Sequence, residues 1–309
     1  MPSLREIRRK IKSVKSTQQI TRAMKMVAAA RMRRAQTAIL SSRPFAVKME
    51  DAVRNLAMLE IASDLQAGRE VAIHPFFDGR LEGRPCLLLV TGDKGLCGAF
   101  NANAIRAAID WLRRQDGRPC VVAAVGRKGR DVLHRLRDAS AETLTEMVGI
   151  FPKVSYVHAE LLGNKLIEAY VNPEGGICSL DVIFNEFKSV VSQRIVTRRL
   201  LPIPMPEFDS KDGGDAVAAK ANTEGFKFEP ARERLLEGLL PRYFKAQLYR
   251  ILLESQAAEL AARMNAMDSA SKNAGELIDS LTLGLNRTRQ AIITREIAEL
   301  VGGAEALAS

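Results

Sequence analysis

The sequence predicts an α/β protein: a long antiparallel two-helix coiled coil formed by both termini, plus a small doubly wound α/β domain between them. The first observation is that residues 5–43 and 243–300 carry helical patterns far longer than those of ordinary globular helices. The second of these helices would span roughly 85 Å at a rise of about 1.5 Å per residue. The second observation is that the pattern between them changes to short apolar runs separated by helical stretches, as in α/β folds. Two helices of this length can bury their apolar faces only by folding back on one another.

The N-terminal helix begins with the spacing of a coiled coil. From Leu4 to Val14, apolar residues recur at alternating intervals of three and four. The pattern then weakens through Gln18 and Thr21, so the start of this helix is the part whose buried face the sequence predicts best.

Pro44 is expected to kink this helix or to restart it, because proline removes a backbone donor and crowds the preceding turn. Ser41 or Ser42 would then serve as the cap of the second half. The helix is expected to end by Gly68.

The middle of the chain has the alternation of strands and helices that is typical of a doubly wound sheet. Two fully apolar runs favour buried parallel strands, and two later runs rich in β-branched residues favour an antiparallel pair. The strands are expected at 86–90, 119–125, 180–187 and 195–201, and the helices at 103–114 and 156–170.

The second long helix is expected to start near Ala231 or just after Pro241. Its apolar residues alternate at spacings of four and three, and this period of 3.5 residues predicts a left-handed supercoil. We call this row of residues the C-terminal seam. It consists of Leu253, Ala257, Leu260, Met264, Met267, Ser271, Ala274, Ile278, Leu281, Leu285, Thr288 and Ile292.

These patterns divide the chain into five segments. The expected segments are a helix at 1–65, a loop at 66–85, the α/β domain at 86–203, a connecting loop at 204–230 and a helix at 231–309. Both loops are rich in residues that interrupt regular structure.

The net charge of +10 is concentrated at the N-terminus. Residues 1–54 contain fourteen Lys and Arg against three acidic residues, which gives a local charge of +11. A basic end of this kind favours an acidic partner, which could be nucleic acid, an anionic lipid surface or an acidic protein surface. No aromatic residue precedes Phe45, which argues against base stacking on nucleic acid.

One glycine-rich turn, Thr91–Gly98, follows a predicted strand and precedes a predicted helix, where backbone N–H groups can cradle a phosphate. It matches neither the Walker spacing nor G-x-G-x-x-G, so a tight structural turn is the competing interpretation. Gly126–Gly129 is a similar but shorter candidate. His74, His134 and His158 lie far apart in the sequence and show no metal-ligand spacing. We therefore expect no catalytic residues, no cofactor and no metal.

Cysteine spacing indicates reduced thiols, and hydropathy indicates no secretory signal and no membrane-spanning segment. The four cysteines are widely spaced and include no C-x-x-C pair, which favours reduced thiols over a zinc site. The N-terminus lacks the apolar stretch of a secretory signal, and no apolar run reaches the ~20 residues that span a bilayer. The chain is expected to be soluble, or peripheral to a membrane through a partner. The cysteines are Cys86, Cys97, Cys120 and Cys178.

Four motifs closely resemble the gamma subunit of F-type ATP synthase, and they occur in the family's order over nearly the whole chain. At Thr91–Lys94 the chain departs from the family's usual Ser-Asp-Arg, which leaves the chemistry of the turn intact. The stretches 66–85 and 209–222 are long for a bacterial member. The four motifs are Ile11–Ala30, Gly95–Asn101, Ala262–Ala270 and Asn286–Val301.

The resemblance implies a central rotor shaft that couples ion-driven rotation of the c-ring to conformational changes in catalytic beta subunits, for ATP synthesis or hydrolysis. It also implies a Rossmann-like α/β domain and a chain that is not itself catalytic. The implied partners are the alpha and beta subunits of the hexamer, the epsilon subunit and the c-ring, with no nucleic acid. Membrane association would occur only through the complex, at the cytoplasmic face of the bacterial plasma membrane.

The family pattern also assigns contact residues by position. Basic residues among them would meet acidic loops of the beta subunits, an attraction that is long-ranged enough to tolerate rotation. Glu229 would contact the c-ring, and Leu300 and Val301 would lie in an apolar bearing at the tip of the shaft. The contact with the beta subunits would comprise Arg22, Met24, Lys25, Arg263, Met264 and Met267.

Two other classes of protein fit part of the sequence. A nucleotide-using enzyme would require a complete phosphate loop, which this sequence does not contain. A basic coiled-coil scaffold that binds nucleic acid would show affinity for duplex DNA with a steep salt dependence. Both alternatives can be separated from the rotor shaft by binding measurements.

Overall fold

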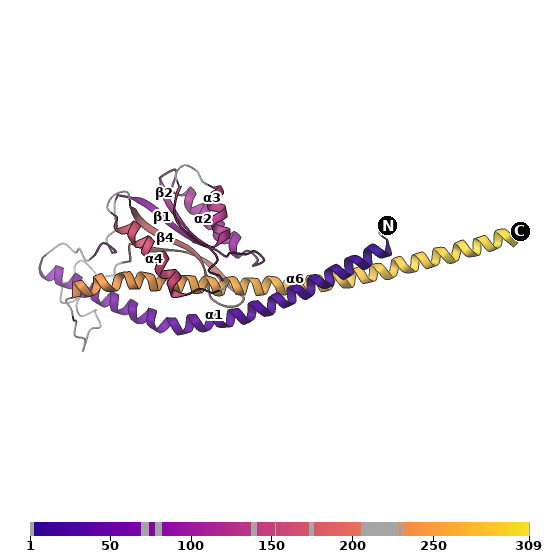
Figure 1. Ribbon diagram of the computed structural model, residues 1–309, viewed down its shortest axis with the longest axis horizontal. Helices are drawn as coiled ribbons and strands as arrows, with labels where there is room; N and C mark the ends of the chain where they lie inside the picture. The colour runs from indigo at the N-terminus through magenta and orange to yellow at the C-terminus, as the bar shows by residue number, and fades with distance from the viewer. Residues whose placement is uncertain are drawn as a thin grey trace. The chain divides into compact units, whose positions relative to one another are not determined.

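The computed structural model describes residues 3–68, 74–77, 82–136, 141–151, 153–172, 176–204, 229 and 232–308. The chain divides into two compact units. We call residues 1–29 with 263–309 the terminal coil, and residues 30–262 the main body. Two long helices, α1 (Leu4–Gln66) and α6 (Arg232–Ala308), contribute to both units (Figure 1).

The main body contains a five-stranded sheet in the order β3-β2-β1-β4-β5. The first four strands are parallel, and β5 pairs with β4 in the antiparallel direction. This order places the change of winding direction between β1 and β4, as in doubly wound folds. The strands are β1 (Arg84–Val90), β2 (Cys120–Val125), β3 (Ala141–Met147), β4 (Ile177–Phe187) and β5 (Gln193–Leu201).

Helices cover both faces of the sheet. On one face, α2 (Phe100–Arg113) and α3 (Arg127–Arg135) pack on strand residues such as Leu87. On the other face, α4 (Tyr156–Val171) packs together with parts of α1 and α6. Alternate strand residues therefore belong to two separate cores, which is the pattern of a sheet buried on both sides.

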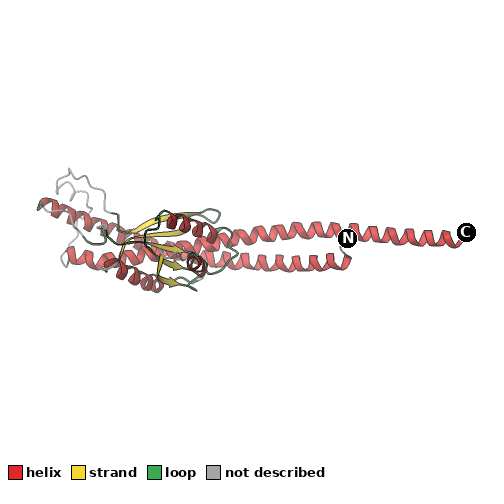
Figure 2. Cartoon of the chain, turned by 90° about the horizontal axis from the view of Figure 1, so that it is seen from above, coloured by secondary structure: helices red, strands yellow, loops and turns green. Residues whose placement is uncertain are grey.

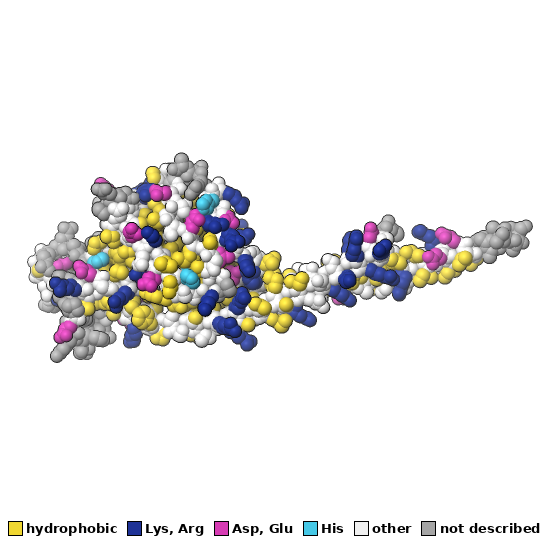
Figure 3. Space-filling view, in the orientation of Figure 1, with side chains coloured by type: hydrophobic (Ala, Val, Ile, Leu, Met, Phe, Trp, Pro, Cys, Tyr) yellow, Lys and Arg dark blue, Asp and Glu magenta, His cyan; other side chains and the backbone are white. Residues whose placement is uncertain are grey.

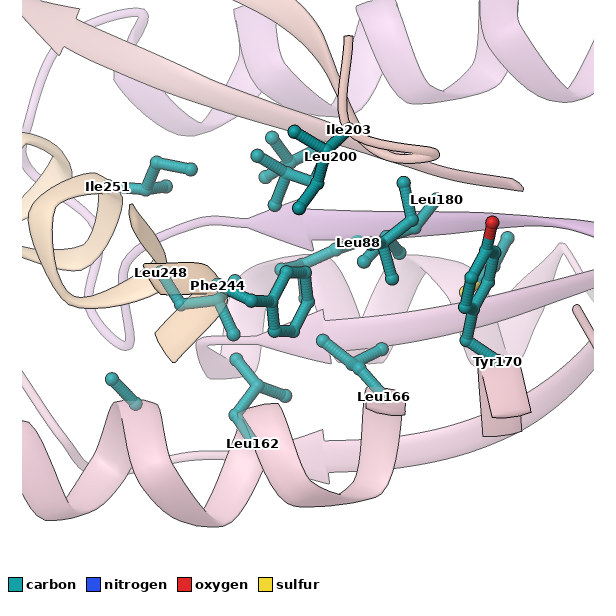
Figure 4. Packing of buried hydrophobic residues seen from close by; sticks show 14 of the residues in the cluster. Leu88, Leu162, Leu166, Tyr170, Leu180, Leu200, Ile203, Phe244, Leu248 and Ile251 are labelled. Carbon is teal, nitrogen blue, oxygen red and sulfur yellow. The ribbon is translucent and has the colours of Figure 1, made fainter. Parts of the chain in front are cut away.

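The core on the second face holds the first part of α6 against the sheet (Figure 4). Phe244 of α6 is only 1% exposed and packs among aliphatic side chains from α4 and the strands. Beyond it, every residue of α6 from 251 to 261 is buried. A helix that is buried all round must be enclosed by neighbours on every side. The labelled partners of Phe244 in this core are Leu88, Leu162, Leu166, Tyr170, Leu180, Leu200, Ile203, Leu248 and Ile251.

On the opposite face, a charge is buried with its partners. The Asp181 carboxylate of β4 accepts hydrogen bonds from Trp111 Nε1 of α2 at 3.0 Å and from the Arg199 guanidinium of β5 at 2.9 and 3.0 Å. Asp181 is 7% exposed, so these bonds replace the water that its charge loses. The hydrogen bond to Asp181 also raises the pKa of Arg199.

The strands and helices predicted for the α/β domain are all present, and β4 and β5 form the predicted antiparallel pair. The sequence analysis did not predict the edge strand β3 or the helix α3 that precedes it in the chain. The long-loop prediction for 209–222 lies outside the described residues, as do 69–73 and 78–81 of the predicted loop at 66–85.

Of the two alternatives predicted for Pro44, a kink or a restart, the restart is wrong, because α1 runs unbroken from Leu4 to Gln66. Ser41 and Ser42 do not cap a new helix; their hydroxyls donate to the carbonyls of Ala38 and Ile39 at 3.0 and 3.1 Å. Burial of the α1 face beyond this point outweighs the cost of an internal proline, about 3 kcal/mol. Likewise α6 begins at Arg232, the earlier of the two predicted starts, with Pro241 inside the helix.

In the terminal coil, the first part of α1 lies antiparallel beside α6 (Figure 2). The amide of Gln18 donates to the carbonyl of Ser271 at 3.2 Å, and Lys25 reaches Asp268, so residue numbers fall on α6 as they rise on α1. Each position of the C-terminal seam from Ser271 to Ile292 is at least half-buried. Every other residue of that stretch is exposed, apart from two glycines, which confirms the predicted seam.

Candidate partner-binding surface

The glycine-rich turn after β1 is tied to two neighbouring segments of the chain by its own carboxylate. Asp93 Oδ1 accepts hydrogen bonds from the backbone N–H groups of Arg127 at 3.1 Å and Gly149 at 2.9 Å. Its Oδ2 accepts another from Phe151 N at 3.4 Å. Arg127 is the first residue of α3, so Asp93 takes the place at the helix N-terminus where a phosphate would bind.

The crevice between β1 and β4, where doubly wound folds bind nucleotides, is also filled by the chain itself. Asn185 at the end of β4 is 3% exposed and donates to the carbonyl of Phe100 at 3.4 Å. Cys97 and Phe100 form a buried cluster with Ala258 of α6. Thr91–Gly98 is therefore a structural turn that docks on α6, as the competing interpretation held.

The second turn, Gly126–Gly129, packs against the first. Gly126 has a positive φ of 91°, and a side chain there would collide with the carbonyl of Thr91. The N–H of Gly129 donates to Thr91 Oγ1 at 2.8 Å. These glycines thus permit close approach of two backbones.

We predict that Asp93→Ala destabilises the main body by about 1–2 kcal/mol, because three backbone donors lose a charged acceptor. Chemical denaturation followed by circular dichroism measures this change. Lys94→Ala, at the exposed neighbouring position, is the control and should leave the midpoint unchanged. Equal stability of Asp93→Ala and the wild type would contradict the assigned role of Asp93.

The histidines and cysteines have local structural roles. Nδ1 of His74 accepts from Phe76 N at 3.2 Å, and Nδ1 of His158 accepts from Ser155 N at 3.1 Å. His134 pairs with Glu146. All four cysteines are buried and form no disulfide, and burial raises the pKa of the Cys86 thiol. Over the described ranges, no cluster of three or more His, Cys, Asp or Glu could hold a metal, and no helix is apolar and long enough to cross a membrane.

The six residues predicted to contact beta subunits all belong to the terminal coil. Arg22 is exposed, whereas Met24, Lys25, Arg263 and Met264 are half-buried. Met267 is 4% exposed and is a core residue of the coil. The structure therefore brings this set together on paired helices, with its members at different depths.

Lys25 is paired within the chain. Its Nζ lies 2.6 Å from Oδ1 of Asp268, and the Nζ of Lys272 lies 3.3 Å from Oδ2 of the same carboxylate. The hydrogen bond from Lys25, and then that from Lys272, lowers the pKa of Asp268 below its ordinary value. The carboxylate is thus ionised at neutral pH, and it links the two helices.

Asp268 and Gln18 are the residues that sequence reasoning missed. Asp268 follows the seam residue Met267 directly, and positions that flank a coiled-coil seam commonly carry interhelical ion pairs. An antiparallel alignment of the two helices, with opposite charges paired on either side of the seam, could have identified the Lys25–Asp268 pair. Gln18 continues the seam with a polar side chain that bonds across to Ser271.

The last part of α6 has no cover within the described chain. Every residue from 293 to 301 is exposed. Ile293, Ile297, Leu300 and Val301 lie three to four residues apart or adjacent, on one side of the helix, and are 46%, 56%, 73% and 55% exposed. Figure 3 shows hydrophobic side chains along this end of the coil. Glu229 is exposed in the main body, and its neighbours lie outside the described residues.

The start of α1 carries the predicted positive charge on the outside of the coil. Six Lys and Arg residues between positions 5 and 15 are exposed, whereas Ile7 is only 6% exposed. Figure 3 shows Lys and Arg side chains on the surface of the coil. The coil therefore buries its apolar face and offers cations to its surroundings.

Comparison with known proteins identifies the family. A family model described as ATP synthase matches residues 3–307. The ATP synthase gamma chain of Elusimicrobium minutum is 44% identical over 309 residues, which cover 99% of both chains. The gamma chain of Anaeromyxobacter sp. (strain Fw109-5) is also 44% identical, over 99% of this chain and 100% of that one. This chain belongs to the ATP synthase gamma chain family. It is therefore a peripheral subunit of an ATP synthase and acts as the central rotor shaft in ATP synthesis and ion transport.

Solved structures agree with this family assignment. The central stalk and c-ring structure of Tetrahymena thermophila mitochondrial ATP synthase contains a chain with 27% identity and a TM-score of 0.56, matched over 82% of this chain and 99% of that one. A chain of the Euglena gracilis mitochondrial ATP synthase has the same fold, with a TM-score of 0.65 at 18% identity, over 98% of this chain and 94% of that chain.

Proposed function

We propose that this chain is a non-catalytic subunit that carries rotation between the c-ring and the catalytic beta subunits of its ATP synthase. The observation that carries this proposal is the terminal coil, which buries its apolar seam and exposes charged residues along α1 and apolar residues at the end of α6. A two-stranded coil presents a different face in each direction. Identical neighbours arranged around it would each meet a different surface, as a rotary mechanism with three equivalent sites requires.

The nature of the exposed groups supports specific partners. Arg22 and the other exposed cations of α1 suit acidic loops on the beta subunits, because opposite charges attract without demanding one fixed geometry. The uncovered stripe that includes Leu300 and Val301 suits an apolar bearing formed by the alpha and beta hexamer. Exposed Glu229 would face the c-ring.

The remaining assignments follow from the same assembly. The epsilon subunit would bind the main body, and the complex would hold the chain at the cytoplasmic face of a bacterial plasma membrane. The filled crevice between β1 and β4 and the engaged Asp93 support a chain that does not itself bind the nucleotide.

Co-expression with the alpha and beta subunits tests this proposal. We expect one copy of the chain to co-purify with a hexamer of three alpha and three beta subunits. The isolated chain should neither hydrolyse ATP nor bind duplex DNA with the steep salt dependence of a nucleic-acid-binding protein. A chain that failed to associate, or that hydrolysed ATP alone, would rule out the proposed role.

A further inference from the structure

An ion pair between the two helices of the terminal coil involves only one of two neighbouring cations on α1. Lys25 and Arg22 lie one turn apart on α1, and both belong to the set expected to meet acidic partner loops. Lys25 is held at 2.6 Å by Asp268 of α6. Arg22 is exposed, and it has no ionic or hydrogen-bond partner in the described part of the chain.

The Lys25–Asp268 pair lies at a point where the two helices are in close contact. Met267, which precedes Asp268, is 4% exposed in the seam, and Gln18 bonds to Ser271 two turns along α1 from Lys25. A side chain at Gly275 would lie 3.0 Å from Gln18 Nε2, so the helices are close there as well. Sliding one helix past the other would break both contacts at once.

Asp268 also balances the charge of its own helix. Its second oxygen takes the ammonium of Lys272, so that one carboxylate serves two cations. The side chains of Lys25 and Asp268 are 42% and 35% exposed, which places the pair at the edge of the seam rather than in its core. Such partly exposed pairs contribute modestly to stability but can set register and pairing.

We propose that Asp268 is a positioning residue for coupling. It fixes the register of α1 on α6 and withdraws Lys25 from the cations that the coil offers to an acidic partner. Arg22 then provides the free charge at this level of the coil. The inference rests on the proposed shaft function. It changes the role of Lys25 from a contact with the beta subunits to an ion pair that joins α1 to α6.

The test uses the full chain assembled with its partner subunits and reconstituted in vesicles. The variants are Asp268→Asn, the charge exchange Lys25→Asp with Asp268→Lys, and Arg22→Gln. Asp279→Asn is the matched control, since Asp279 is an exposed carboxylate of α6 about three turns further along the coil. Two quantities are measured: the yield of assembled complex, and the ratio of ions pumped to ATP hydrolysed.

We expect Asp268→Asn to lower the pumping ratio roughly threefold, because the loss of a partly exposed ion pair changes the population of the correct helix register by a factor of a few. The charge exchange should restore at least half of that loss, although the ammonium introduced at position 268 would be weakly repelled by Lys272 in the same helix. Asp279→Asn should behave as the wild type. Arg22→Gln should lower the ratio at normal assembly and reduce its dependence on salt.

Three outcomes would overturn the inference. One is an Asp268→Asn complex that pumps as well as the Asp279→Asn complex. Another is a charge exchange that couples no better than Asp268→Asn. The third applies if the Asp268→Asn complex does not assemble. In that case, failure of the charge-exchange variant to assemble would reject the proposed role of the Lys25–Asp268 pair. Absence of coupling in the wild-type complex would instead reject the shaft function itself, so the two failures are distinguishable.

Discussion

Truncation of Phe244 to alanine is expected to destabilise the main body by about 3–5 kcal/mol, the largest loss of stability that we predict. Phe244 is 1% exposed, and it fills the space between α6, α4 and the sheet (Figure 4). Its removal takes away apolar burial and leaves a cavity whose rigid lining cannot fully collapse. Both effects act in the same direction.

Chemical denaturation of the isolated chain, followed by circular dichroism, measures this loss. Phe45→Ala is the matched control, because Phe45 is 60% exposed on α1 and makes the same change in side-chain chemistry. The control should shift the unfolding free energy by less than about 0.5 kcal/mol. Equal effects of the two substitutions would mean that α6 is not anchored through this core.

The Phe244 core also shows what the heptad pattern can and cannot predict. Spacing alone indicated correctly which face of α6 is covered between Ser271 and Ile292, whereas from 251 to 261 α6 is buried all round and the spacing distinguishes no face. The same spacing does not reveal what covers it. Near Phe244 the neighbours are a sheet and α4, whereas near Ser271 the neighbour is α1. Periodicity reports burial, and the identity of the partner surface depends on tertiary contacts.

The missed elements have a related cause. The strand β3 has the sequence Ala-Glu-Thr-Leu-Thr-Glu-Met and lies at the edge of the sheet, where polar residues alternate with half-buried ones. The helix α3 is nine residues long and rich in charge. Neither carries the continuous apolar run that made β1 and β2 predictable.

The candidate surface was predictable in part for a comparable reason. Motif resemblance located Lys25 and Met267, because both lie in long family-specific stretches. It could not show that Lys25 is paired with Asp268, since these residues are 243 positions apart in the chain and meet only after the helices align. The depth of each side chain in the coil is likewise a property of the folded pair.

Substitution of Met24 by lysine is expected to impair coupling much more than assembly, and it has the largest functional effect that we predict. Met24 is half-buried next to Lys25, in the same unit as Met264 and the buried Met267. A lysine at this half-buried position adds a second cation next in sequence to Lys25 and alters the charge that this part of the coil presents to the partner. We expect the ratio of ions pumped to ATP hydrolysed to fall roughly fivefold or more, as like charges at a contact disfavour its correct geometry.

Met26→Lys is the control for this experiment, because Met26 is 62% exposed and lies two residues away on a different side of α1. The same charge is added there without disturbing the pair, so coupling should stay close to that of the wild type. Complex yield, ATP hydrolysis and ion pumping are compared for both variants in reconstituted vesicles. Normal pumping by Met24→Lys would remove Met24 from the proposed contact with the beta subunits. Equal losses in both variants would show that the net charge of α1, and not the position of the added cation on the helix, controls coupling.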